Sequence, residues 1–484
     1  MRPVINFALA AVLLGACAGQ PSTSTTAQGP RINTLSGTLE GRVDAASGAQ
    51  VFEGVPYAAP PVGNLRWRAP QAVASWQGVR SATRLGHNCL QHRPYGDIDA
   101  TVAGTSEDCL YLNVWTPSTT GNLPVMVWIH GGGFFAGFGG EERHNPGPLV
   151  KKGAVVVTVN YRLGPMGFLA HPAIAAEATT QTSGNFGLLD QIAALQWVKR
   201  NIARFGGDPS RVMIFGESAG AMSVGELIGS PLAKGLFQRA VLESGTGTTL
   251  VQSRAAAEST GLRLATSLGV SGNDAATLAR LRAIPGDSII AAAVRMAPNA
   301  GSPMFWPVLD RYVLPVPVDS AIVQGRANLV PTIVGSNRDE PEVIFGGPAR
   351  SLARLLSARG VPTYVYLFTR VAEDSVNRRA GAYHSAEITF VFGRPQPLQP
   401  SAGHTSYDAR LADAMSDFWV AFARNADPNG PPAAGKWPTW PRYDAATDSY
   451  MELGPEIAPR AGFPRRTVLD SLDAVGRAQG QIRP

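Results

Sequence analysis

Short apolar runs alternate along this chain with segments whose apolar residues recur at helical spacing. The runs 125–129 (VMVWI) and 154–159 (AVVVTV) lack the polar alternation of a half-exposed strand, so they predict strands that are covered on both faces. Apolar residues at three- and four-residue steps over 192–205 predict a helix that is capped by Asp190 and ended by Gly206. Further strands are predicted at 212–215, 240–242, 332–334 and 364–368, with a helix from about residue 219. This order predicts an α/β protein with a mostly parallel twisted sheet and helices on both faces.

The first residues depart from this pattern. A positive start at Met1-Arg2 leads into the apolar run 7–14, which is too short to span a bilayer. The run ends in Leu-Gly-Ala-Cys at 14–17, which resembles a bacterial lipobox, so 1–16 is predicted to be a lipoprotein-type signal peptide and Cys17 the lipidated residue. Ordinary signal cleavage is the alternative, since 16–18 also fits an A-x-A-like site. The chain is therefore predicted to be exported to a bacterial cell envelope as a periplasmic or outer-membrane lipoprotein, with a soluble secreted or periplasmic protein as the alternative.

The rest of the chain is predicted to form a tether and one large domain. Residues 17–30 are polar and rich in Pro, Ser and Thr, which predicts a flexible tether. No linker interrupts 31–484, so these residues are predicted to form a single domain.

Composition narrows the class of function. With 44% hydrophobic and 16% charged residues, the 484-residue chain has ordinary globular composition. Its net charge of +6 comes from scattered basic residues with no run longer than two. A diffuse surplus of this kind affects solubility and does not form a polyanion site, so nucleic-acid binding is not expected.

A G-x-S-x-G motif, Gly216-Glu217-Ser218-Ala219-Gly220, joins the strand predicted at 212–215 to the helix that follows. The motif alone is weak, but a strand–turn–helix setting is what it requires. A sharp turn needs neighbours with little side chain, and it exposes the serine at a helix N-terminus, where partial positive charge favours an oxyanion. Ser218 is therefore predicted to be a nucleophile.

A second motif, His130-Gly131-Gly132-Gly133, directly follows the strand at 125–129. Consecutive glycines let backbone N–H groups point into a cavity without obstruction from Cβ atoms, as an oxyanion hole demands. A plain glycine turn is the alternative, but both motifs occur in the expected order.

A serine nucleophile also needs a base and a carboxylate that orients it. Only His384 and His404 follow Ser218 in the chain, and His384 comes after the strand predicted at 364–368, whereas His404 lies in a Pro- and Ser-rich stretch. Order and elimination favour His384. The acid candidates after the strand at 332–334 are Asp339, Glu340 and Glu342, and physical reasoning alone does not choose among them.

Taken together, these residues resemble a known family, the type-B carboxylesterases, which includes para-nitrobenzyl esterases and cholinesterases. The resemblance covers nearly the whole chain after the tether, and it implies the α/β-hydrolase fold. It is carried by GESAG and by four further segments: 52–58 (FEGVPYA), 107–114 (EDCLYLNV), 160–164 (NYRLG) and 184–191 (GNFGLLDQ).

The resemblance implies roles that the pattern left open. It implies that Glu340 is the acid, because the family's acid follows an Asp in a segment like 336–340, and that His384 is the base. It also implies a supporting role for Ser244 and a disulfide between Cys89 and Cys109, which leaves only Cys17 of the three cysteines unpaired. That disulfide would close 20 residues and contribute roughly 3 kcal/mol. The implied oxyanion donors are the N–H groups of Gly132, Gly133 and Ala219.

Two departures from the family pattern stand out. Pro341 occupies a position that is usually Gly; it could start a helix, but it removes an N–H. Only 44 residues separate Glu340 from His384, several dozen fewer than is usual. The missing stretch normally contributes helices near the mouth of the site, so a shallower, more open entrance and tolerance of bulky esters are predicted.

The expected reaction is ester hydrolysis through an acyl-enzyme, with a small-molecule ester as the partner and broad specificity. No metal or organic cofactor is expected, because the sequence offers no convincing His/Cys cluster. Membrane association is expected only through the N-terminal lipid, and the sequence leaves the oligomeric state open. The rivals are a non-catalytic binding protein, disfavoured because all three triad residues are present, and serine chemistry on carbamates, lactones or amides.

Overall fold

The computed structural model describes residues 29–92, 102–296, 305–371, 375–395 and 405–478. Residues 1–28, which hold the predicted signal peptide, Cys17 and nearly all of the predicted tether, lie outside the described residues, and so does His404. None of the described helices has the length and apolar character that crossing a bilayer requires.

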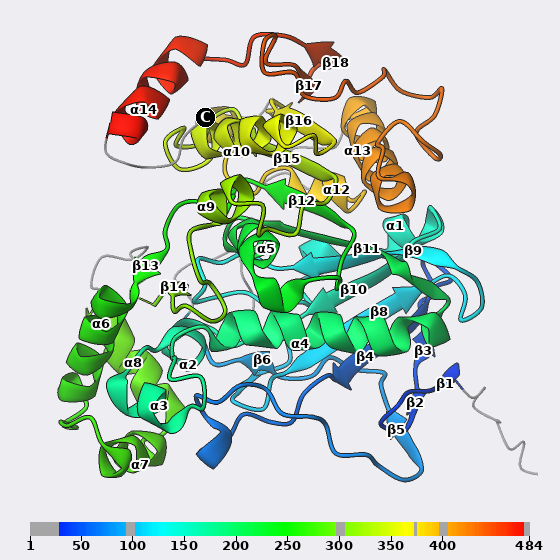
Figure 1. Ribbon diagram of the computed structural model, residues 1–484. Helices are drawn as coiled ribbons and strands as arrows, with labels where there is room; N and C mark the ends of the chain where they lie inside the picture. The colour runs from blue at the N-terminus through cyan, green and yellow to red at the C-terminus, as the bar shows by residue number, and fades with distance from the viewer. Residues whose placement is uncertain (1–28, 93–101, 297–304, 372–374, 396–404, 479–484) are drawn as a thin grey trace, which may run out of the picture.

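One 11-stranded mixed sheet runs through the molecule (Figure 1). Its order is β18-β17-β16-β15-β12-β11-β9-β10-β8-β4-β3, and neighbours from β17 to β10 are all parallel. Antiparallel strands complete both edges. The strands are β3 (Arg42–Val43), β4 (Gln50–Pro56), β8 (Tyr111–Thr116), β9 (Leu123–Ile129), β10 (Val155–Val159), β11 (Gly207–Glu217), β12 (Arg239–Glu243), β15 (Thr332–Asn337), β16 (Thr363–Phe368), β17 (Tyr450–Leu453) and β18 (Ile457–Arg460).

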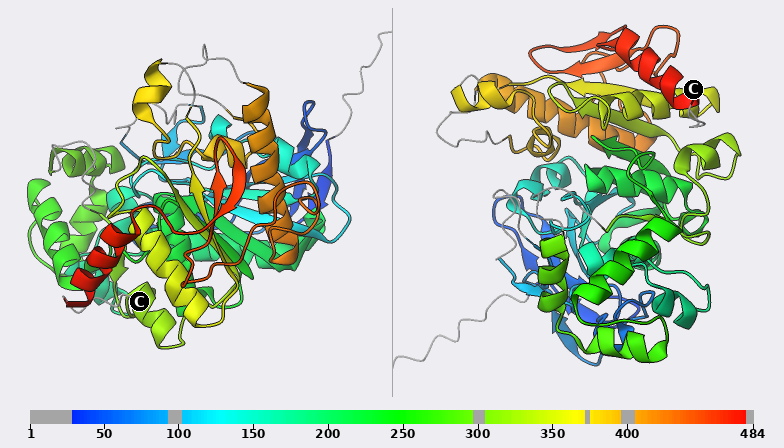
Figure 2. Two further views of the ribbon diagram at one scale, coloured as in Figure 1. Left: turned by 90° about the horizontal axis from the view of Figure 1, so that it is seen from above. Right: turned by 90° about the vertical axis from the view of Figure 1, so that its left-hand side faces the viewer.

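The central strands are apolar on both faces because each face packs against its own layer of helices. In β9, Val125 and Val127 belong to one core cluster, whereas Met126 and Trp128 belong to the other. The first cluster includes residues of α4 (Phe186–Asn201), α5 (Ala219–Gly229) and α10 (Gly346–Ala358). The second includes residues of α1 (Gly147–Lys151), α12 (Ile388–Val391) and α13 (Ser406–Asn425). The predicted mostly parallel sheet with helices on both faces is confirmed (Figures 1 and 2).

The remaining elements lie around this framework. Short helices gather at one end of the sheet, at the lower left of Figure 1: α2 (Gly164–Phe168), α3 (Pro172–Glu177), α6 (Arg254–Ser267), α7 (Ala275–Ala283) and α8 (Gly286–Met296). Three small sheets contain β1 (Arg31–Asn33), β2 (Thr38–Glu40) and β5 (Val79–Ser81); β6 (Asn88–Cys89) and β7 (Thr105–Ser106); and β13 (Gln252–Ser253) and β14 (Val308–Leu309). The other helices are α9 (Val318–Val323), α11 (Ser375–Ala380) and α14 (Arg466–Ala478).

One prediction of a helix boundary is wrong. Helix α4 begins at Phe186, so Asp190 lies within the helix and does not cap it. Its buried carboxylate instead accepts hydrogen bonds from the Arg162 side chain at 2.7 and 2.8 Å, because a fully buried charge needs a partner more than a helix needs its cap. The other end is as predicted: after a short 3₁₀ turn, Gly206 adopts the left-handed conformation with φ 78°.

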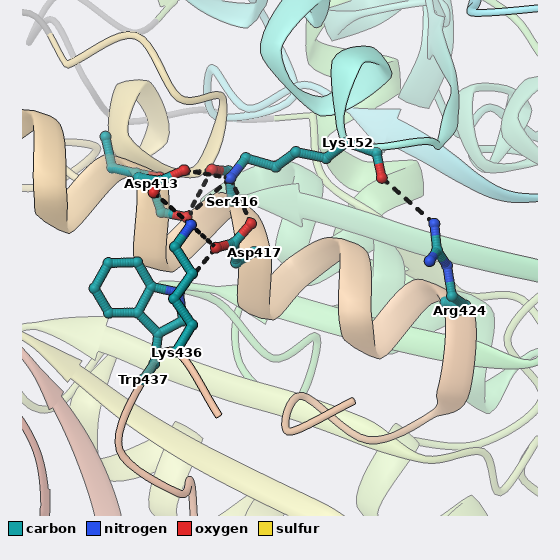
Figure 3. A network of polar contacts seen from close by, with 8 residues as sticks. Lys152, Asp413, Ser416, Asp417, Arg424, Lys436 and Trp437 are labelled. Carbon is teal, nitrogen blue, oxygen red and sulfur yellow. Dashed lines mark hydrogen bonds and ion pairs between the residues drawn. The ribbon is translucent and has the colours of Figure 1, made fainter. Parts of the chain in front are cut away.

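Charged groups fix α13 to its neighbours (Figure 3). Lys152, which follows α1, lies 2.5 Å from a carboxylate oxygen of both Asp413 and Asp417. Lys436 contacts the other oxygens of the same two residues, at 2.6 and 2.7 Å. Two cations and two anions thus alternate where α1, α13 and the segment after α13 meet.

Candidate active site

Ser218 occupies the sharp turn between β11 and α5. Its backbone has φ 57° and ψ −122°, a conformation that costs a non-glycine residue about 1–3 kcal/mol. The turn is held because the Ser218 N–H donates to Glu243 O, at 2.9 Å, at the end of the neighbouring β12. The strain leaves the hydroxyl at the N-terminus of α5, as the motif predicted.

Close packing explains the two glycines of the motif. A Cβ at Gly216 would lie 2.5 Å from Ile129 O, and one at Gly220 would lie 2.0 Å from the same oxygen. Any side chain would therefore push the turn away from the end of β9. Ser218 and the glycine loop that follows β9 are held next to each other by this contact.

His384 lies within reach of the Ser218 hydroxyl. Its Nε2 is 2.8 Å from Ser218 Oγ, and its Nδ1 is 2.5 Å from Glu340 Oε1. The serine follows β11, the glutamate follows β15, and the histidine lies in the loop before α12. Because these strands are parallel, their carboxyl ends meet at one edge of the sheet, and residues far apart in sequence come together there.

Hydrogen bonds fix the carboxylate of Glu340. Its Oε2 accepts from the Ser244 hydroxyl at 2.9 Å and from the Asn337 N–H at 2.7 Å, which leaves Oε1 for His384. Ser244 is itself in a left-handed conformation, with φ 54°, directly after β12. The structure thus places Ser244 against Glu340, on the side away from His384.

The other two acid candidates have different partners. The Asp339 carboxylate accepts from Ala382 N at 2.7 Å and pairs with Arg338, so it ties the segment before Glu340 to the loop that holds His384. Glu342 forms an ion pair with Arg465 at 2.8 Å. Of the three candidates, only Glu340 is hydrogen-bonded to His384. Pro341 starts a turn in which its own carbonyl accepts hydrogen bonds from the N–H groups of Ile344 and Phe345. Helix α10 begins only at Gly346.

The glycine loop lies against the serine turn. A Cβ on Gly131 would lie 3.2 Å from Ser218 Cβ. Gly132 and Gly133 have φ 102° and 63°, and a Cβ on Gly132 would overlap Ala136 O at 2.2 Å. Within the described part of the chain, the N–H groups of Gly132, Gly133 and Ala219 donate to no backbone carbonyl. Burial lowers the pKa of His130, at the start of the loop, to about 4, so this residue adds no charge.

Sequence reasoning missed a cluster of buried carboxyl groups behind the histidine. Glu217 Oε1 lies 3.2 Å from His384 Nε2. Glu387 Oε1 lies 3.3 Å from Ser244 Oγ, and its Oε2 accepts from Asn337 Nδ2 at 2.5 Å. Burial, and then the charges of Glu217 and Glu340, raise the pKa of Glu387 to about 8. Both residues lie beside residues of the predicted triad, one before Ser218 and the other three after His384, and that proximity was the available signal.

The electrostatics of His384 follow from these carboxylates. Burial would lower its pKa, but the charge of Glu217 and the hydrogen bond with Glu340 outweigh burial and raise the pKa to about 9. One face of the ring stacks on Phe345, with ring centroids 4.5 Å apart. The side chain is 37% exposed. The size of the entrance stays a prediction.

Glu217, Glu340 and His384 also offer ligand atoms within 4.8 Å of one another, a spacing that a metal ion could bridge. However, both ring nitrogens of His384 face partners at hydrogen-bond distance, Nδ1 towards Glu340 and Nε2 towards Ser218. A cation at either nitrogen would displace that contact. The arrangement suits proton transfer along Ser218, His384 and Glu340 better than it suits a resident metal.

Cys89 and Cys109 form a disulfide that links β6 to the segment just before β8. Both cysteines are buried.

A parallel sheet that carries a strained serine at a strand–helix turn, with a histidine and an acid from later strands, defines the α/β-hydrolase class. The chain belongs to the carboxylesterase family, whose model matches residues 28–345 and 341–468. It is therefore a carboxylic ester hydrolase.

Individual relatives agree with this assignment. The chain is 35% identical to a fumonisin B1 esterase of Sphingopyxis macrogoltabida, over 89% of this chain and 87% of that one. It is also 35% identical to a para-nitrobenzyl esterase of Bacillus subtilis, over 88% and 95% of the two chains. Among solved structures, a carboxylesterase of Geobacillus stearothermophilus superposes with a TM-score of 0.79 at 31% identity, covering 91% of this chain and 99% of the other.

Proposed function

We propose that this carboxylesterase hydrolyses esters through an acyl-enzyme on Ser218, with His384 as general base and Glu340 as the acid that orients it. The observation that carries the proposal is the continuous contact from Ser218 Oγ through the His384 ring to Glu340 Oε1, at 2.8 and 2.5 Å. Nucleophile, base and orienting carboxylate are the three parts that serine acyl transfer requires.

In the first half-reaction, His384 Nε2 takes the proton from Ser218 as Oγ attacks the ester carbonyl. Glu340 accepts from the Nδ1–H and stabilises the imidazolium that forms, while Ser244 and Asn337 hold its other oxygen. The N–H groups of Gly132, Gly133 and Ala219 donate to the tetrahedral oxyanion, each contributing about 3 kcal/mol to lowering the barrier. Imidazolium then protonates the leaving alcohol, and water repeats the sequence on the acyl-enzyme.

We further propose broad specificity, including bulky esters. The short segment between Glu340 and His384 and the 37% exposure of the His384 side chain support this proposal. Para-nitrobenzyl esters and fumonisin B1 belong in the substrate panel because the names of two relatives refer to them.

The test compares the wild type with Ser218→Ala on a p-nitrophenyl acyl ester series, with Ser81→Ala, a change at an exposed serine, as the control. Ser218→Ala should lower kcat by about 10⁴-fold or more, whereas the control should keep it. Rates within about tenfold of one another across acyl lengths would support broad specificity. A folded wild type that is inert on every ester would favour a binding protein, and faster cleavage of matched amides, carbamates or lactones would move the bond specificity away from esters.

The N-terminal proposal is independent of the chemistry. We propose that Cys17 is lipidated after removal of 1–16, that 17–30 tethers the enzyme to the envelope, and that 31–484 is a single domain. Mass spectrometry of the mature N-terminus from a bacterial host, beside Cys17→Ser, tests this. Diacylglyceryl-Cys17 is expected; an unmodified mature end in the wild type would support free export.

A further inference from the structure

The far end of the glycine loop is held by a side chain from outside the loop. The Gln91 carboxamide contacts both backbone groups of Gly137: its Oε1 accepts from Gly137 N at 2.9 Å, and its Nε2 donates to Gly137 O at 3.1 Å. The same Nε2 also donates to Cys89 O at 3.0 Å. One amide side chain thus reproduces the paired bonds of a β-bridge.

Gly137 is the point at which this loop closes on itself. It has φ 103°, and a Cβ there would lie 2.5 Å from His130 Nδ1 and 2.6 Å from Gly131 O. Within the loop, Ala136 N donates to Gly132 O at 3.0 Å. Gly132 and Gly133 lie between two parts of the loop that contact each other, with His130 and Gly131 before them and Gly137 after them. Holding Gly137 therefore also fixes Gly132 and Gly133.

The other supports of the loop act elsewhere. At its start, the Tyr161 hydroxyl donates to His130 O at 2.8 Å, and the two rings stack. Beyond Gly137, Gly139 N donates to the Asn160 side chain, which in turn donates to His87 O. Between these supports, Gln91 is the side chain that bonds the closing residue Gly137 itself.

Gln91 is in turn held by the disulfide. It lies two residues after Cys89, which is bonded to Cys109, and its amide returns to the Cys89 carbonyl. The disulfide attaches Cys89 to Cys109, just before β8, and therefore limits how far Gln91 can move from Gly137.

We propose that Gln91 is a positioning residue for the oxyanion hole, acting through Gly137, and that the Cys89–Cys109 disulfide keeps it in place. This inference rests on the proposed function, in which Gly132 and Gly133 donate to the oxyanion. Donors that stand at the oxyanion position stabilise the transition state more than the bound ester, so loss of the clamp lowers kcat and leaves KM nearly unchanged.

The experiment compares Gln91→Met, which keeps the size and removes the hydrogen bonds, with Gln71→Met at an exposed glutamine as the control. Titration with a fluorophosphonate counts the active sites, so that rates refer to folded enzyme only. Gln91→Met should lower kcat on p-nitrophenyl butyrate by about 10- to 100-fold, with KM within about twofold of the wild type. If Gln91→Met does not fold, Gln91→Glu serves instead, since it keeps an acceptor for Gly137 N and loses the donor to Gly137 O.

A trifluoromethyl ketone distinguishes positioning from a merely structural role. It forms a tetrahedral adduct on the serine and places an oxyanion in the hole, so its affinity should fall by the same factor as kcat/KM. The matching methyl ketone, as a ground-state ligand, should bind as in the wild type. If Gln91→Met keeps both its kcat and its affinity for the trifluoromethyl ketone, the inference is overturned. The proposed function would still stand in that case, because it depends only on the activity of the wild type.

The disulfide part is tested by a double-mutant cycle. Cys89→Ser/Cys109→Ser should lower kcat in the same direction, and adding Gln91→Met should then cause a smaller further loss than it causes alone. Fully additive losses would overturn the claim that the disulfide acts through Gln91.

Discussion

The rings of Phe345 and His384 are stacked, with centroids 4.5 Å apart and planes 23° apart. Phe345 follows Glu340 by five residues, so one turn supplies both the carboxylate on Nδ1 and the aromatic face beneath the ring. A cation over an aromatic face is favoured by about 0.5–2 kcal/mol, and His384 becomes a cation during each proposed half-reaction. The stack should therefore stabilise the imidazolium as well as orient it.

Replacing Phe345 tests this directly. Phe345→Leu should lower kcat by about 3- to 20-fold, because the imidazolium loses its aromatic partner. It should also lower the pKa of His384, so that the acid limb of the kcat/KM profile moves to lower pH. Phe345→Trp, which keeps an aromatic face, should restore both values towards the wild type. A reduced kcat with an unmoved acid limb would show that Phe345 only fills space.

Removing the acid tests how the base is oriented. Glu340→Gln should lower kcat on the order of 10⁴-fold, because an amide can donate to Nδ1 and favour the wrong tautomer of His384. The control is Glu342→Gln, whose carboxylate pairs with Arg465 at the surface, and it should keep kcat within about twofold of the wild type. Steady-state kinetics at one pH suffices, and equal losses in both variants would count against Glu340 as the acid.

The sequence revealed those parts of the site that depend on local rules. Ser218 follows from a short motif between a strand and a helix, and the parallel sheet follows from apolar runs without alternation. Asp339, Glu340 and Glu342 could not be separated physically, because their roles depend on which carboxylate turns towards His384. This is decided largely by Ser244 and Ala382, which lie on other segments of the chain. The Phe345 stack and the buried Glu387 were missed for the same reason. Asp190 was misassigned because its partner, Arg162, lies 28 residues away.

A buried arginine holds the C-terminal helix. Arg350, on α10, is fully buried; it lies 2.8 Å from Asp448, which is also fully buried, and 2.8 Å from Asp470 of α14. Arg350→Met should destabilise the fold by about 3–5 kcal/mol, because Asp448 would keep its charge without its buried partner. Arg354→Met, at a partly exposed residue 3.6 Å from Asp470, should lose less than about 1 kcal/mol. Urea unfolding of both variants measures the difference, and equal losses would contradict the role of burial.

The charge network of α13 allows a similar comparison within one cluster (Figure 3). Asp417 is nearly fully buried and contacts both Lys152 and Lys436, but the Lys152 side chain is 17% exposed and that of Lys436 is 46% exposed. Lys152→Met should destabilise the fold by about 1–3 kcal/mol, because a charged hydrogen bond to a buried group is lost. Lys436→Met should lose less than about 1 kcal/mol, since water can replace it. Thermal melts of the two variants should show this order, and the reverse order would contradict it.

The charge of Glu217 should control the pH dependence of the reaction. In the proposed mechanism His384 accepts the serine proton only in its neutral form, so kcat/KM should rise with pH until the pKa of His384, about 9, has been passed. Glu217 raises this pKa because its negative charge favours the imidazolium 3.2 Å away. Glu217→Gln removes the charge at nearly constant size, so it lowers the pKa and should move the acid limb of the profile to lower pH. The variant should then have a larger fraction of neutral His384 at pH 7, even where its limiting kcat/KM at high pH falls.

Glu177→Gln, at a carboxylate paired with Arg68 and Arg282 on the surface, should leave the acid limb where it is. Profiles of kcat/KM from pH 5 to 10 on one p-nitrophenyl ester measure the shift, and an acid limb at the same pH in the wild type and Glu217→Gln would rule out this control by Glu217.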